Sequence, residues 1–207
     1  MEKIKRLWAH KIVRMFVWAL LILLGLYLVL VAFRVVHFFN LDKTNAQVEK
    51  IHNTKLTLND VMRTNLPPEP VDADETVAGI DANQNGIRDD VELAIFKEYP
   101  NSAKTRAVLL QYALVLQMQM TLPVVNKETV TATAEDRSKA LNCVWSITSR
   151  ENMERFLEIT EKNENFVKEL QLNTEQRKKY RETFYEYLGS YTASHKGCDI
   201  DLSTLSN

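Results

Sequence analysis

The feature that constrains this chain most is a run of 19 uncharged, apolar residues at positions 15–33 (MFVWALLILLGLYLVLVAF). A helix of this length spans about 28 Å, close to the thickness of the hydrocarbon core of a bilayer. A buried helix of a soluble protein usually keeps one polar face, and a cleaved signal peptide has a shorter apolar region followed by a small-residue cleavage site. The run at positions 15–33 has no polar face, is longer than the apolar region of a signal peptide and is not followed by a small-residue cleavage site. The sequence therefore predicts a retained signal-anchor, a transmembrane helix at residues 15–36 whose first partner is membrane lipid.

Charged residues flank this run unequally. Five lysines and arginines precede it within residues 1–14, whereas only Arg34 and Lys43 lie within about 15 residues after it. By the positive-inside rule, residues 1–14 stay in the cytoplasm and the chain after the anchor lies outside it. The predicted location is the inner (cytoplasmic) membrane, crossed once, with a periplasmic or extracellular C-terminal domain.

The composition of the rest of the chain bounds its fold and its partners. Residues 1–33 hold five of the 26 basic and one of the 27 acidic residues, which leaves 21 basic and 26 acidic residues after the anchor. This mildly acidic part argues against nucleic acid as a partner, because phosphate binding needs a basic face. No phosphate-binding or dinucleotide fingerprint occurs, so no nucleotide is expected either. Glycine is scarce and three of the five prolines cluster within residues 67–70, which favours an all-α domain.

The pattern along the chain predicts four regions. They are a cytoplasmic N-terminus (1–14), the transmembrane anchor (15–36), a stalk and Pro-rich linker (37–80) and a helical extracytoplasmic domain (81–207). Apolar residues at helical spacing predict helices at about 90–99, 102–120, 150–170 and 174–191. A capping box from Thr133 predicts another helix to about residue 147, and the β-branched stretch before it, 124–133, leaves a strand open as an alternative. The predicted fold is all-α: one transmembrane helix followed by a small helical bundle with one calcium-type loop.

One segment carries recognisable chemistry, the twelve residues DANQNGIRDDVE at positions 81–92. Side-chain oxygens stand at its positions 1, 3, 5, 9 and 12, a glycine at position 6 and a usable backbone carbonyl at position 7. Calcium takes six to eight oxygen ligands, and this alternation aims successive side chains at one point. The candidate ligands are Asp81, Asn83, Asn85, the carbonyl of Ile87, Asp89 and Glu92. We expect a structural Ca²⁺ ion, bound at about 10⁻⁴–10⁻³ M because two ligands are neutral amides.

The segment resembles the calcium loops of EF-hands and, more closely, those of thrombospondin type 3-like repeats. The resemblance covers 12 of 207 residues and implies that Asp89 binds the ion directly or through a water. Arg88 departs from it, because an EF-hand has an apolar residue there, and a Pro-rich approach replaces the entering helix. The alternative for the same residues is an Asn85-Gly86 turn followed by a capping box from Asp89 to Glu92. With the stretch 66–70 before it, the loop also makes the chain look like uncharacterised bacterial membrane-anchored proteins, a likeness that brings no activity.

Two cysteines and an absence of catalytic motifs complete the prediction. Cys143 and Cys198 are expected to pair if the domain lies in an oxidising compartment, and the alternative is a buried Cys143 with an unpaired Cys198. None of the four histidines has a metal-binding spacing, and no hydrolase motif occurs, so no catalytic residue is assigned and an enzyme is not expected. The function expected is a tethered module that binds an unknown protein partner or supports an envelope assembly. The alternative is a tethered hydrolase whose site forms only in the fold.

Overall fold

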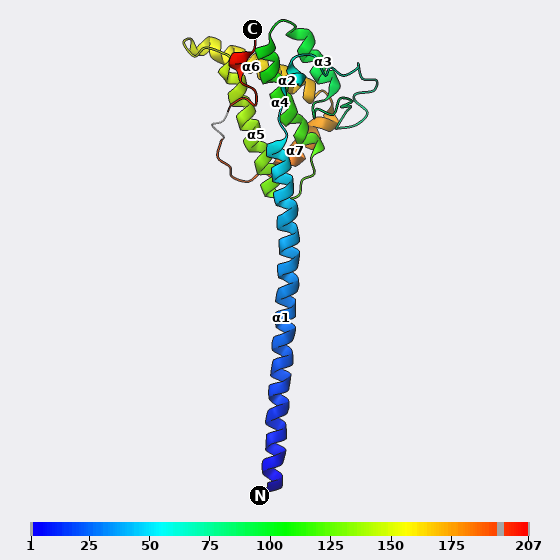
Figure 1. The fold of residues 1–207 in the computed structure, drawn as a ribbon, viewed down its shortest axis with the longest axis vertical. Coiled ribbons are helices and arrows are strands. Elements are labelled where there is room, and N and C mark those ends of the chain that lie inside the picture. Colours follow the sequence, from blue (N-terminus) through cyan, green and yellow to red (C-terminus); the bar gives the residue numbers. More distant parts are fainter. Residues whose placement is uncertain (1, 194–196, 207) are drawn as a thin grey trace. The chain divides into compact units, whose positions relative to one another are not determined.

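The structure, a computed structural model, describes residues 2–193 and 197–206, with the backbone alone for residues 2–10 and 12. Within these ranges there are seven α-helices, one short 3-10 helix and no strand, so the predicted all-α fold is confirmed (Figure 1). The elements are α1 (Glu2–Asn53), α2 (Leu58–Val61), α3 (Asp89–Glu98), α4 (Ala103–Thr121), α5 (Lys127–Ser146), α6 (Met153–Gln171), α7 (Glu175–Glu186) and the 3-10 helix Leu202–Thr204.

Helix α1 contains the predicted anchor. It is long and apolar enough to cross a membrane, and its most apolar stretch of 18 residues is not buried at all. A core helix of a soluble domain would be covered by other elements, so this exposure removes support from that interpretation. The chain divides into two compact units, Met1–Asn45 and Ala46–Asn207, and the boundary falls inside α1.

The second unit is organised around α4. The predicted helix at about 102–120 is confirmed. Its N-cap is Ser102, and the Ser102 hydroxyl oxygen accepts a hydrogen bond from the backbone N–H of Thr105 at 3.1 Å. Nearly the whole helix is buried, including Met118 and Met120, because α3, α5, α6 and α7 pack against it. The helix therefore forms the centre of the core, and these methionines are core residues.

The start of α5 differs from the prediction. The possible strand at 124–133 and the capping box at Thr133 are both wrong, because the helix begins at Lys127 with Asn126 as its N-cap. The Asn126 side-chain oxygen accepts from the Thr129 N–H at 3.2 Å. Val130 and Thr133 are buried inside the helix, which packs on α4, so burial outweighs the strand preference of β-branched residues. Similarly, α6 is capped by Asn152 and begins at Met153, three residues after the predicted start.

The segment predicted as stalk and linker is in large part attached to the helical unit. The compact unit begins at Ala46, whereas the sequence placed the start of the domain at residue 81. Leu56 and Val61 are buried in the core, and the fully buried guanidinium of Arg177 donates to the carbonyls of Ala73, Thr76 and Val77 at 2.7–3.0 Å. Regular structure is absent from the described residues 66–88, as the prolines predicted, but hydrogen bonds from α7 hold part of that stretch in place.

A disulfide joins Cys143 of α5 to Cys198 in the C-terminal segment, so the predicted pairing is confirmed. It holds the neighbouring Asp199 against the core. The Asp199 carboxylate pairs with Lys139 and accepts from the Leu56 N–H at 3.2 Å. The crosslink therefore stabilises contacts between the C-terminal segment, α5 and the chain that follows α1.

Candidate functional site

Residues 81–87 form a tight loop whose side-chain oxygens hold its own backbone. The two oxygens of Asp81 accept from the N–H groups of Asn85 and Gly86 at 3.1 and 2.9 Å, and Asn85 Oδ1 accepts from the Ile87 N–H at 2.8 Å. Gly86 has φ +84°, a conformation that side chains with a Cβ rarely adopt. A Cβ at this position would also lie 2.8 Å from Cδ1 of Leu114. The predicted turn is thus present, and glycine is required at its centre.

The loop closes on Asp89, the first residue of α3. The Asp89 N–H donates to the carbonyl of Ile80 at 2.9 Å, and both oxygens of its carboxylate accept from the Ala82 N–H at 3.1 Å. The side chain is fully buried, and this burial is the largest cause of its raised pKa. The N-cap of α3 is Arg88, and no side-chain hydrogen bond caps the helix. The alternative of an Asp89–Glu92 capping box is therefore wrong.

Glu92 brings three of the predicted ligands together. Its Oε2 accepts from the side-chain amides of Asn83 and Asn85 at 3.1 and 3.0 Å. Its Oε1 is buried and has no hydrogen-bond partner among the described residues. The residue is fully buried, and desolvation raises the pKa of the Glu92 carboxyl to about 7. A buried acidic oxygen without a partner is costly and calls for an explanation, such as a proton or a cation.

Residues from outside the loop complete its surroundings. The Asn83 amide also donates to the carbonyl of Asn65 at 2.6 Å, and the charge of the buried Asp60 contributes to the raised pKa of Glu92. A hollow of about 620 Å³ beside the loop is lined mainly by amides and hydroxyls, including those of Asn59, Thr57 and Gln84. Sequence reasoning missed Asp60 and Asn65, because they belong to α2 and the Pro-rich stretch and only the fold brings them to the loop.

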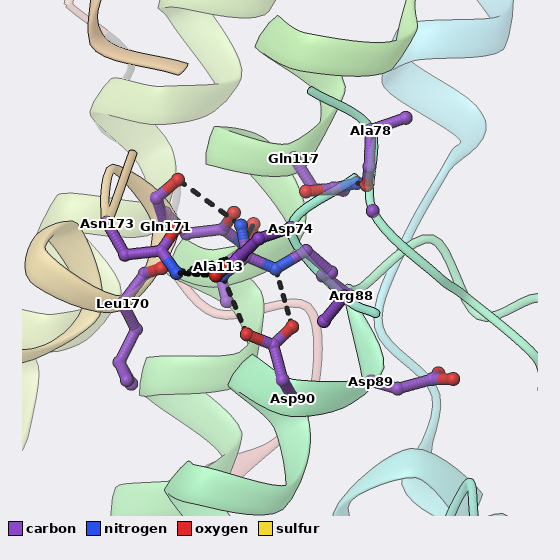
Figure 2. A network of polar contacts seen from close by, with 12 residues as sticks. Asp74, Ala78, Arg88, Asp89, Asp90, Ala113, Gln117, Leu170, Gln171 and Asn173 are labelled. Atoms are coloured by element: carbon purple, nitrogen blue, oxygen red, sulfur yellow. Dashed lines mark hydrogen bonds and ion pairs between the residues drawn. The ribbon is translucent and has the colours of Figure 1, made fainter. Parts of the chain in front are cut away.

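Arg88 explains the departure from the EF-hand pattern at position 8 of the loop. Its fully buried guanidinium donates to both oxygens of Asp90 at 2.5 and 2.8 Å (Figure 2). It also donates to the carbonyls of Leu170 and Gln171 at 2.6 and 3.4 Å, at the end of α6. Carbonyls in the last turn of a helix lack intrahelical donors, so a guanidinium satisfies them well. Gln171 continues the network by donating to the carbonyl of Ala113 in α4 at 3.2 Å. The arginine thus fixes the loop to α6.

Three of the predicted ligands converge in the loop, but its carboxylates are not clustered. Among the residues that the structure describes, no three His, Cys, Asp or Glu side chains come close enough to hold a metal ion. The set that does converge is one carboxylate, Glu92, and two amides, Asn83 and Asn85. Both asparagines present Nδ2 to Glu92, because Oδ1 of Asn85 accepts from the Ile87 N–H and Nδ2 of Asn83 also donates to the Asn65 carbonyl. The unpartnered Oε1 of Glu92 is the observation that fits a cation.

A second polar pair lies elsewhere in the helical unit. Nδ1 of His52 is 3.3 Å from Oδ1 of Asp136, beside a hollow of about 560 Å³ that Lys55 and Lys139 also line. Burial raises the pKa of Asp136, and the neighbouring His52 opposes that shift. The two residues are 84 positions apart, so no local motif could reveal the pair.

Comparison of the chain with protein-family models, with curated proteins and with solved structures found no match. The functional argument therefore rests on the geometry of the chain itself.

Proposed function

We propose that this chain is a single-pass membrane protein whose helical unit lies outside the cytoplasm and binds a protein partner or supports an envelope assembly. The observation that carries the proposal is the uncovered apolar stretch of α1, because 18 apolar residues exposed to water would be strongly unfavourable. The excess of lysine and arginine before this stretch supports the orientation. The disulfide supports the compartment, since such bonds persist in oxidising surroundings.

An aromatic surface on α7 supports the interaction role. Tyr180 and Tyr187 are 37% and 47% exposed, and Val125, which precedes α5, is 41% exposed. They border a hollow of about 460 Å³ with the buried Phe184 among its lining residues. Tyrosine is enriched at the centres of protein interfaces, where its ring packs and its hydroxyl stays hydrogen-bonded. We assign this surface, called the α7 aromatic surface below, to the partner.

A photo-crosslinking amino acid at position 187 of the full chain, in native membranes, tests this assignment. The matched control carries it at Glu161, an exposed position on α6. We expect one discrete crosslinked species from position 187 and none from position 161. The substitution Tyr180→Asp should abolish that species without lowering the amount of protein in the membrane. The same species from both positions, or none from either, would count against the assigned surface.

The proposal includes a structural calcium ion in the loop 81–92. Glu92 would hold the ion, and the carbonyl of Ile87 is near in sequence. The amides of Asn83 and Asn85 would turn by half a turn to offer their oxygens, which gives up their hydrogen bonds with the Asn65 carbonyl and the Ile87 N–H. Asp81 and Asp89 already accept backbone N–H groups, but a carboxylate has about four lone-pair sites and can serve a cation as well. The ion would neutralise a buried charge and fix the Pro-rich stretch to the start of α3. An ion bound in this way would have a structural role, and no reaction step is assigned to it.

The second candidate is a membrane-tethered hydrolase, and the His52–Asp136 pair favours it. A carboxylate that accepts from one ring nitrogen of a histidine orients the other nitrogen as a general base. Hydrolysis of generic ester and amide substrates by the purified full chain, compared with its His52→Ala variant, tests this function. Turnover that is equal in the two proteins, or absent from both, would remove it.

A further inference from the structure

A further hollow of the helical unit lies between α5 and α7 and is separate from the loop and from the α7 aromatic surface. Its volume is about 930 Å³, near the upper end of the range for pockets that bind small organic ligands. Arg137 of α5 and Arg181 of α7 line it, together with Lys178, Leu172 and Tyr185. Of its seven lining side chains, three are cationic and two are acidic.

The two arginines leave hydrogen-bond donors unused. Nε of Arg137 and Nε of Arg181 are both buried, and neither has an acceptor among the described residues. The three other arginines of the helical interior are different. Arg88, Arg106 and Arg177 donate to backbone carbonyls, and two of them also to carboxylates. Since a buried donor without an acceptor costs about 1–3 kcal/mol, water or a bound anion is needed to satisfy the donors of these two arginines.

Two phenols lie beside Arg137. Burial lowers the pKa of Arg137, but the phenols of Tyr185 and Tyr112 outweigh burial and raise it, so they favour the charged guanidinium. Tyr185 accepts a hydrogen bond from Gln119 at 3.0 Å, which leaves its own O–H free to donate. The guanidinium of Arg181 lies over the Tyr185 ring at 5.3 Å, a contact that positions the arginine without using its N–H groups.

Two glutamates of α7 also line the hollow and decide where an anion can bind. Glu182 and Glu186 reduce the local charge to about +1, and neither forms an ion pair with Arg137 or Arg181 in the described part of the chain. Both belong to α7, so the end of the hollow beside Arg137 on α5 is the favourable place for a negative group.

We propose that this hollow binds a small organic anion. Its carboxylate or phosphate group accepts from the guanidinium N–H groups of Arg137 and Arg181, and its apolar or aromatic body lies against Leu172 and Tyr185. Guanidinium forks match the geometry of both oxyanions, and an apolar wall with a few convergent donors is the usual composition of a ligand site. The proposal does not depend on calcium or on the protein partner.

Arginine Nε–H signals of the ¹⁵N-labelled full chain in detergent micelles report directly on this site. The probes are phenyl phosphate, benzoate, inorganic phosphate and the neutral control phenol. We expect saturable shifts of the Arg137 and Arg181 signals with phenyl phosphate or benzoate, weaker binding of inorganic phosphate and no binding of phenol. The substitutions Arg137→Gln and Arg181→Gln should each weaken binding at least tenfold. Lys179→Gln, an equal charge change at an exposed position of α7, should weaken it less than twofold.

Several results would overturn the proposal. Shifts that do not saturate, or an equal loss in the Lys179 variant, would mean general charge attraction. Inorganic phosphate bound as tightly as phenyl phosphate would mean a small-ion site only, and phenol bound as tightly as benzoate would mean an apolar hollow without anion recognition. If Arg137→Gln lowers the melting temperature, Arg137→Lys keeps the charge without the fork. Normal binding by that variant would refute the assigned role of the fork.

Discussion

The substitution Glu92→Gln separates the buried charge from the proposed ion. Without metal, the native Glu92 carboxyl has a pKa of about 7, whereas an unfolded glutamate has a pKa of about 4.3. The native state therefore holds this proton more tightly. The contribution of this proton to the free energy of unfolding favours the folded state below the unfolded pKa and is lost as the pH rises through 7. At pH 8 the ionised, buried carboxylate costs about 3 kcal/mol, and the isosteric, neutral glutamine avoids that cost.

Thermal unfolding of the full chain in detergent, followed by circular dichroism, measures the effect. In chelator at pH 8, Glu92→Gln should melt up to about 6–12 °C higher than the parent chain, since 1 kcal/mol corresponds to about 2–4 °C in a unit of this size. At pH 5 the two should differ little. The control Glu98→Gln, at an exposed position of the same helix, should melt like the parent at both pH values.

Calcium should narrow the difference in stability between the parent chain and the Gln variant. At 5 mM, an ion bound at about 10⁻⁴–10⁻³ M stabilises the parent chain by about 1–2 kcal/mol at pH 8 and leaves the Gln variant unchanged. The stabilisation should shrink at pH 5.5, where protons compete for the carboxylate. Equal stabilisation of parent and variant would show that Glu92 is not a ligand. A parent chain that becomes more stable in chelator as the pH rises through 7 would refute the argument from buried charge.

Three further substitutions test the packing around the site. Cys143→Ser opens a crosslink between residues 55 positions apart and should destabilise the unit by about 4 kcal/mol at most, measured as a lower urea midpoint without reductant. Arg177→Gln removes a fully buried guanidinium and should cost about 3 kcal/mol or more, with faster hydrogen exchange at residues 73–77; Lys179→Gln should do neither. Gly86→Ala should cost about 1–2 kcal/mol and weaken calcium binding, whereas Gly197→Ala, which meets no atom within 4 Å, should be neutral in both measurements.

Those parts of the fold that depend on local patterns were predictable. The unbroken apolar run predicted the long apolar helix α1, and helical spacing predicted α4. The predicted ranges 102–120 and 174–191 begin at Ser102 and Thr174, which are the N-caps of α4 and α7. The start of α5 was not predictable in this way, because its β-branched residues resemble a strand until their burial against α4 is known. The attachment of the Pro-rich stretch was also hidden, since Arg177 reaches it from about 100 positions away.

In the candidate site, too, only the contacts within a short stretch of sequence were predictable. Spacing within twelve residues sufficed to place Asn83, Asn85 and Glu92 together, since the loop is short and its glycine forces the turn. Spacing did not reveal that Asp89 bonds to the backbone of Ala82 or that Arg88 ties the loop to α6. The His52–Asp136 pair and the hollow at Arg137 could be recognised only from the fold, because no local motif surrounds these residues.

A pair of reporter fusions after the last residue tests the placement of the helical unit most directly. Alkaline phosphatase becomes active only in an oxidising compartment outside the cytoplasm, whereas green fluorescent protein exported unfolded stays dark. If the helical unit lies outside the cytoplasm, we expect an active phosphatase fusion and a dark fluorescent fusion, both retained in membranes after alkaline carbonate extraction. A bright fluorescent fusion with an inactive phosphatase would place the helical unit in the cytoplasm, and release by carbonate would show that α1 does not span the membrane.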